Sequence, residues 1–172
     1  PDAYVSVGVG DGDEYSIEGS LGGPVAGERL LGRLSAKYIE REGYLQNITR
    51  NEKADRFEDL AVRGRLIWEP TDALTLDARA ALNQHKGRGI GFQFQGVDLA
   101  PDGITATGFG TGTGPIDANN VLPVRDNNQA LGERDMYDVA LKIDWATAIG
   151  RVTSVSAYTD IEEWSDSDQF PY

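Results

Sequence analysis

The chain has 172 residues, of which 40% are hydrophobic and 9% aromatic, and its formal net charge at pH 7 is −12. This apolar content is too high for a disordered chain, and the acidic balance argues against nucleic acid as a partner, because phosphate binding requires clustered Lys and Arg. The chain has no cysteine and one histidine, which excludes a disulfide scaffold, a thiolate zinc site, a cysteine nucleophile and a mechanism with paired histidines.

Hydrophobic and polar residues alternate along the chain with the period of two that is typical of β-strands. In chain order, the expected strands lie near residues 3–9, 15–21, 29–42, 58–68, 74–84, 135–145 and 151–163. No run of about 18 apolar residues predicts a transmembrane helix, but the alternation fits transmembrane β-strands, whose signal extends over roughly 10 residues. We therefore expect an all-β fold, an antiparallel up-and-down meander of about seven strands.

The clearest strands place apolar residues on one face and charged residues on the other, because successive side chains of a strand point to opposite sides. The charged faces carry Arg33, Lys37, Arg41, Arg63, Arg65, Asp77 and Arg79. Tyr38, Trp68 and Trp145 lie near the ends of expected strands, where a girdle of aromatic residues at a membrane interface would need them.

The expected connections are short at one end of the sheet and long at the other. The short ones lie at residues 22–27, 69–73 and 146–150, and the long ones at residues 43–57, 85–134 and 164–172. Outer-membrane β-barrels have this arrangement. Alternating strands are equally typical of half-buried soluble sheets, so the alternative is a soluble or surface-anchored β-sheet module for binding or adhesion.

Four segments of the chain resemble parts of one receptor family. Residues 15–25 (YSIEGSLGGPV) resemble the second barrel strand and first periplasmic turn, and residues 31–44 the third strand entering a loop, of the TonB-dependent outer-membrane receptors. Residues 62–72 are similar to a strand and turn in which a Trp-Glu-Pro element closes the hairpin. Residues 152–158, with the acidic residues after them, resemble a later strand. The resemblance covers nearly the whole chain apart from the longest loop.

The resemblance implies a segment of an outer-membrane receptor for the energised uptake of a scarce solute, either an iron–siderophore complex, cobalamin or a glycan. The implied partners are outer-membrane lipid, the receptor's own plug domain, the TonB energy-transducing complex and the small solute. Neither the plug domain nor the energy-coupling box of the family is visible in this sequence. About seven strands cannot close a barrel of the family's size. We therefore interpret residues 1–172 as a partial β-barrel domain, an incomplete arc of the barrel, and we expect the sequence to start inside a longer protein.

The segment that starts at His85 places cationic groups beside glycines and aromatic residues, which suits contact with an anionic or chelate-type ligand. The candidates for ligand contact are His85, Lys86, Arg88, Phe92, Phe94 and Trp164. The glycine spacing gives neither a dinucleotide fingerprint nor a P-loop, and the alternative is a solvated strand end that leads into a flexible loop. For the seven charged residues, we consider two roles: contact with a solute or plug, and structural pairing across adjacent strands.

The remaining motifs predict no catalytic or metal chemistry. The acidic segments at residues 11–14 and 162–168 lack the ligand spacing of an EF-hand, and solvated loops explain them better. Nothing resembles a nucleophile with a base. We therefore expect neither an enzyme nor a cofactor.

Overall fold

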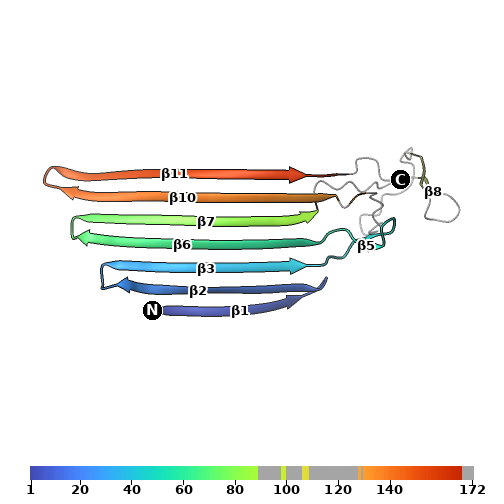
Figure 1. Ribbon diagram of the computed structural model, residues 1–172, viewed down its shortest axis with the longest axis horizontal. Coiled ribbons are helices and arrows are strands. Elements are labelled where there is room, and N and C mark those ends of the chain that lie inside the picture. The colour runs from blue at the N-terminus through green and yellow to red at the C-terminus, as the bar shows by residue number, and fades with distance from the viewer. Residues whose placement is uncertain (89–97, 100–105, 109–127, 129, 168–172) are drawn as a thin grey trace.

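The computed structural model describes residues 1–88, 98–99, 106–108, 128 and 130–167. Its main element is one antiparallel sheet of seven strands, in the order β1-β2-β3-β6-β7-β10-β11. The strands are β1 (Asp2–Gly10), β2 (Glu14–Ala26), β3 (Leu30–Arg41), β6 (Phe57–Thr71), β7 (Leu74–Arg88), β10 (Leu131–Thr147) and β11 (Gly150–Ser165). The predicted all-β meander is confirmed. The sheet is not closed into a barrel, and β1 and β11 form its two edges (Figure 1).

The connections differ in length between the two ends of the sheet (Figure 1). At the turn end, residues 27–29, 72–73 and 148–149 join neighbouring strands directly. At the loop end, the segment between β3 and β6 contains a small hairpin of β4 (Gln46–Asn47) and β5 (Glu52–Lys53), and the segment between β7 and β10 contains β8 (Asp98–Leu99) and β9 (Ala106–Gly108).

The strands extend beyond their predicted limits at the turn end. Residues 22–26 and 69–71 were expected in turns, but they continue β2 and β6. A register shift between Pro24 and Ala26 and another between Trp68 and Thr71 carry the pairing past the prolines. Pro24 lies beyond Asp2, the first paired residue of β1, so its missing N–H removes no bond to that strand.

The strands are also longer than predicted at the loop end. His85 pairs with Arg134, and β7 and β10 remain paired up to Arg88 and Leu131. The loops predicted at residues 85–134 and 43–57 therefore overlap with strands. The hydrophobic alternation stops before these residues, whereas the backbone ladder continues, because its hydrogen bonds do not depend on which side chains are apolar.

The sheet encloses no hydrophobic core within the part of the chain that the structure describes. Ala130 is the one buried hydrophobic residue there, whereas large apolar side chains such as Leu21, Leu66 and Trp145 are exposed. A single layer of strands leaves both of its faces open, and such extensive exposed apolar surface indicates an interaction with lipid or protein. Among the same described residues, no helix is long and apolar enough to cross a membrane.

Candidate functional site

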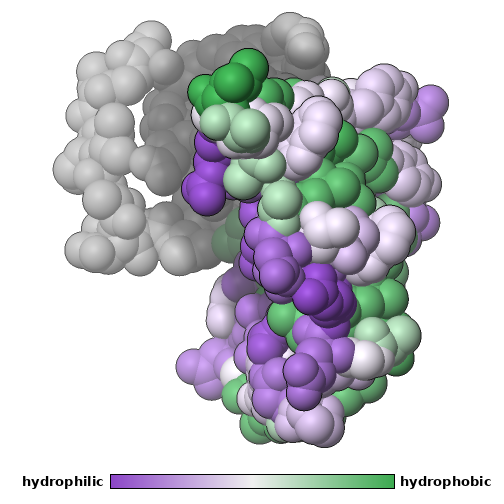
Figure 2. Space-filling view, turned by 90° about the vertical axis from the view of Figure 1, so that its left-hand side faces the viewer, coloured by the Kyte–Doolittle hydropathy of each residue, from purple (hydrophilic) through white to green (hydrophobic). Residues whose placement is uncertain are grey.

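The register of the seven strands assigns every side chain of the sheet to one of two faces, because paired residues point to the same side. The polar face carries Arg33, Lys37, Arg41, Arg63, Arg65, Asp77 and Arg79. The apolar face carries Leu30, Leu34, Leu66, Leu76, Leu141 and Ile143. In the end-on view of Figure 2, hydrophilic residues gather on one side of the sheet and hydrophobic residues on the other. All seven charged residues singled out in the sequence thus share one face.

The apolar face forms a band of constant width across the central strands. On each of four strands, β3, β6, β7 and β10, the band consists of five residues at alternate positions. The segments that contain them are nine residues long: 30–38, 60–68, 74–82 and 137–145. Nine residues match the length of a tilted transmembrane strand, roughly 9–11 residues. Toward the loop end, the same face becomes charged in one paired row of Glu40, Glu58, Lys86 and Glu133.

Aromatic side chains border the apolar band at both ends. Trp68 and Trp145 lie at the turn end, and Tyr15 and Tyr38 lie at the loop end. Trp68, Trp145 and Tyr15 expose about half of their surface. Aromatic rings with a polar atom favour the boundary between hydrocarbon and water, so the band has the borders of a membrane-facing surface.

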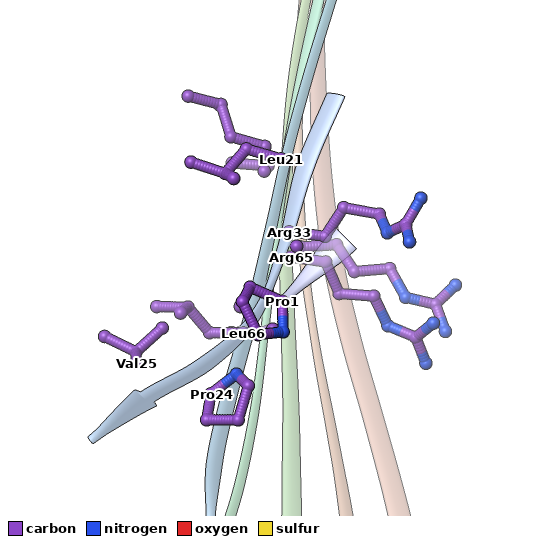
Figure 3. Close-up of a pocket in the computed structure, with 15 residues that line it drawn as sticks. Pro1, Leu21, Pro24, Val25, Arg33, Arg65 and Leu66 are labelled. Carbon is purple, nitrogen blue, oxygen red and sulfur yellow. The ribbon is translucent and has the colours of Figure 1, made fainter. Parts of the chain in front are cut away.

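Three arginines lie side by side on the polar face. Arg33 of β3 pairs with Arg65 of β6, which in turn pairs with Arg79 of β7. Figure 3 shows Arg33 and Arg65 on one side of the strands, whereas Leu21, Val25 and Leu66 extend from the other. Like charges directly opposite each other destabilise a sheet, so this row requires carboxylates or another anion beside it.

Asp77 supplies part of that negative charge. Arg65 donates to its two oxygens from Nε and Nη2 at 2.9 and 2.8 Å, and Arg79 donates to the same carboxylate at 3.4 and 2.9 Å. Only 11% of the Asp77 side chain is exposed. At the edge of the sheet, Arg33 donates to Asp2 at 2.6 Å. One carboxylate therefore joins two neighbouring strands through bidentate contacts, which are the strong form of an ion pair.

A hollow of about 580 Å³ lies on the polar face above these groups. Arg33, Arg63, Arg65 and Arg79 line it together with smaller residues of β6, β7 and β10. A second hollow of about 580 Å³, on the apolar side, is lined in part by the leucines and Val25 of Figure 3.

A second cluster of planar groups lies at the loop end of the polar face. The guanidinium of Arg41 lies 5.1 Å from the ring centre of Tyr44 and 4.5 Å from that of Phe57. Phe57 stacks on His85 with ring centres 6.4 Å apart, and Nδ1 of His85 lies 2.6 Å from a carboxylate oxygen of Asp59. Cation–π contacts of this kind stabilise a partly exposed site by about 0.5–1 kcal/mol each.

The first long connection is attached to this cluster by hydrogen bonds. Asp55 accepts hydrogen bonds from the backbone N–H groups of Tyr44 and Leu45 at 2.8 and 2.7 Å. The Tyr44 hydroxyl donates to the carbonyl of Asp11 at 2.8 Å, which joins the connection to the β1–β2 turn. These contacts fix the segment over the loop end of β1–β3.

Arg56 bridges two carboxylates that face each other across β3 and β6. It donates to Glu40 at 3.0 Å and to Glu58 at 2.8 Å. Partial burial lowers the pKa of Arg56, but the charges of Glu42, Glu58 and Glu40 raise it, and the net pKa lies above the ordinary value. The guanidinium stays charged and offsets part of the repulsion between the two carboxylates.

The four candidates for ligand contact that the structure describes do not form one site. His85 and Arg88 line a small hollow of about 280 Å³ at the loop end. Lys86 lies on the opposite face, 3.7 Å from Glu133, and Trp164 is the cross-strand partner of that glutamate. Phe92 and Phe94 lie outside the described residues. His85 and Lys86 point to opposite faces of the sheet, because they are consecutive residues of one strand, and their contact with a ligand stays a prediction.

Sequence reasoning missed the partners that complete both clusters. Asp59, Tyr44 and Phe57 contact the candidate residues. Tyr44 and Phe57 lay inside the predicted first loop, and Asp59 lay near the start of the strand after it. The sequence also predicted no partner for Asp2, which accepts a hydrogen bond from Arg33. The register is the signal that would have found Asp59 and Phe57, since they pair with His85 and Arg41 once β6 is extended by one residue.

Comparison with known proteins gave no matching family model, no matching curated protein and no matching solved structure.

Proposed function

We propose that this chain is part of the wall of an outer-membrane β-barrel, within a TonB-dependent receptor that takes up a scarce solute. The observation that carries the proposal is the apolar band, nine residues long on each of four adjacent strands and bordered by aromatic residues at both ends. Such a band is what the lipid-facing surface of a membrane barrel requires.

Two further features support the same proposal. The turn end has short connections and the loop end has long ones, as in outer-membrane barrels, whose extracellular loops are the longer. The lack of a hydrophobic core among the described residues favours this proposal over a soluble binding module, which would have to bury its apolar face.

In this proposal, the polar face lines the interior of the barrel and the loop end faces the outside of the cell. The long connections capture the solute, and the plug rearranges when the solute binds. Energy comes from the TonB complex of the inner membrane. The solute is an iron–siderophore complex, cobalamin or a glycan.

Uptake measurements test the transport function. Cells that contain the full-length protein, with or without the energising complex, receive one radiolabelled solute at a time: ferric siderophores, cobalamin, or oligosaccharides. We expect at least one solute to enter only when both the protein and the complex are present. As a control, the amount of the protein in the outer membrane is measured and is equal in the cells with and without the complex. Equal uptake with and without the complex would reject energised transport.

A further inference from the structure

Among the described residues, the arginines that line the hollow outnumber the carboxylates beside them. Four guanidiniums line the hollow, those of Arg33, Arg63, Arg65 and Arg79. In the part of the chain that the structure describes, three carboxylates lie near them: Asp2, which pairs with Arg33, Asp77, which pairs with Arg65 and Arg79, and Asp138, which lines the hollow and accepts a hydrogen bond from Thr159 at 2.8 Å. The hollow therefore keeps an excess of positive charge, although the chain as a whole is strongly acidic.

Arg63 is the guanidinium that the neighbouring side chains leave available. It has no hydrogen-bond or ion-pair partner among the described residues. Its cross-strand neighbours are Ser35 and Ala81, and neither carries a charge. Ser20 continues this row on β2 as the neighbour of Ser35; it is buried, and its hydroxyl has no partner within the described part of the chain. The row thus presents polar donors that lack acceptors.

Asp77 shows what kind of group fits this surface. Its two oxygens accept hydrogen bonds from guanidiniums of two adjacent strands at once. The fork of an arginine matches the geometry of a carboxylate, and a ligand with several carboxylates can repeat this contact with Arg33, Arg63 and Arg65. Ala81, the cross-strand partner of Arg63, lines the same hollow on the polar face, and its small side chain leaves space beside the guanidiniums.

We propose that the hollow lined by Arg33, Arg63, Arg65 and Arg79 binds a small solute with two or more carboxylates. The site is distinct from the planar cluster at the loop end of the sheet. It does not require the apolar face to contact lipid, so failure of this inference and failure of the proposed membrane function can be distinguished.

Calorimetric titration of the full-length protein in detergent micelles tests the inference, with tricarballylate as the probe. Tricarballylate has three carboxylates but lacks the hydroxyl group of citrate, so binding reports on the arginines rather than on a metal chelate. We expect saturable binding, with weaker binding of propionate, which has one carboxylate. No saturable binding of tricarballylate, or equal binding of inorganic phosphate, would overturn the inference.

Arg63→Gln is the decisive variant, because it removes a guanidinium without leaving a described carboxylate unpaired. We expect an affinity for tricarballylate about tenfold lower, the effect of losing one charge-assisted contact. Lys37→Gln is the matched control: it removes one positive charge from the same face, where Lys37 lies 3.6 Å from Glu18 and outside the hollow. We expect it to change the affinity by less than about twofold. An equal loss in both variants would overturn the site.

An acidic segment of the protein itself is a second source of carboxylates for these arginines. A photoreactive amino acid in place of Ala81, at the hollow, distinguishes the two sources. If the solute occupies the site, tricarballylate suppresses the cross-linking of this residue to the rest of the protein. Cross-linking within the protein together with no tricarballylate binding would overturn the proposal in favour of an acidic segment of the protein.

Discussion

Leu66→Arg is expected to destabilise the protein in a bilayer by about 2 kcal/mol. A cation in the middle of a barrel's lipid face costs roughly 2–4 kcal/mol. Leu66 is the fourth of the five apolar positions between residues 60 and 68, one step from the middle of the band, so the lower end of this range applies. Its side chain is about half exposed and faces away from the arginines. Urea titration in phospholipid vesicles, followed by tryptophan fluorescence, measures the free energy of unfolding.

Ile67→Arg is the matched control, because it places the same cation one residue further along the strand and on the other face. Ile67 pairs with Asp77 across β6 and β7, so the new guanidinium has a carboxylate within reach. We expect a change of less than about 0.5 kcal/mol, as for a surface substitution. If both variants lost the same free energy, the assignment of the two faces to lipid and water would be wrong.

Asp77→Asn is expected to lower the free energy of unfolding by about 2 kcal/mol. The substitution removes the charge that holds Arg65 and Arg79 together and leaves three arginines in one row with one fewer counter-charge. Losing one partner of a buried ion pair costs roughly 3–5 kcal/mol. We expect a loss below this range because both guanidiniums are about half exposed to water, which weakens the ion pairs. Urea titration in detergent micelles measures the loss.

Two further variants distinguish the effect of the lost Asp77 charge from a nonspecific loss of stability. Asp72→Asn breaks an ion pair of similar length, 2.7 Å from Arg29, but the Asp72 side chain is 95% exposed, so we expect a loss below about 1 kcal/mol. Adding Arg79→Gln to Asp77→Asn removes one of the repelling charges and should restore part of the stability. A double variant that is less stable than Asp77→Asn alone would argue against repulsion within the arginine row.

The period-two alternation was sufficient to predict the seven strands and the sharing of faces within the sheet. In β10, for example, Tyr137, Val139 and Leu141 alternate with charged or small residues, and the pattern is independent of which strand lies beside it. Strand limits were less predictable. Gly22 to Ala26 carries the turn-forming residues Gly and Pro, yet the paired backbone of β3 keeps this segment extended.

The contacts of the candidate site depended on register, which the sequence does not encode locally. The charged residues were predictable, but the row of Arg33, Arg65 and Arg79 results from which residues of three strands lie opposite each other. One residue of slip in a single strand would move its charges to the other face. For the same reason, the sequence placed His85 and Lys86 in one group, whereas the structure separates them.

A scan of single cysteines along β10 tests the central claim, that the apolar face contacts lipid and the polar face contacts water. The 172 residues contain no cysteine, so each variant adds one reactive thiol to this part of the protein, and the full-length protein without the added cysteine gives the background labelling. Even-numbered positions from 138 to 142 lie on the polar face and odd-numbered positions from 139 to 143 on the apolar face. With the full-length protein in membranes, a water-soluble maleimide should react at the even positions and fail at the odd ones, while all react after denaturation. Odd positions that react as fast as even ones would contradict the claim.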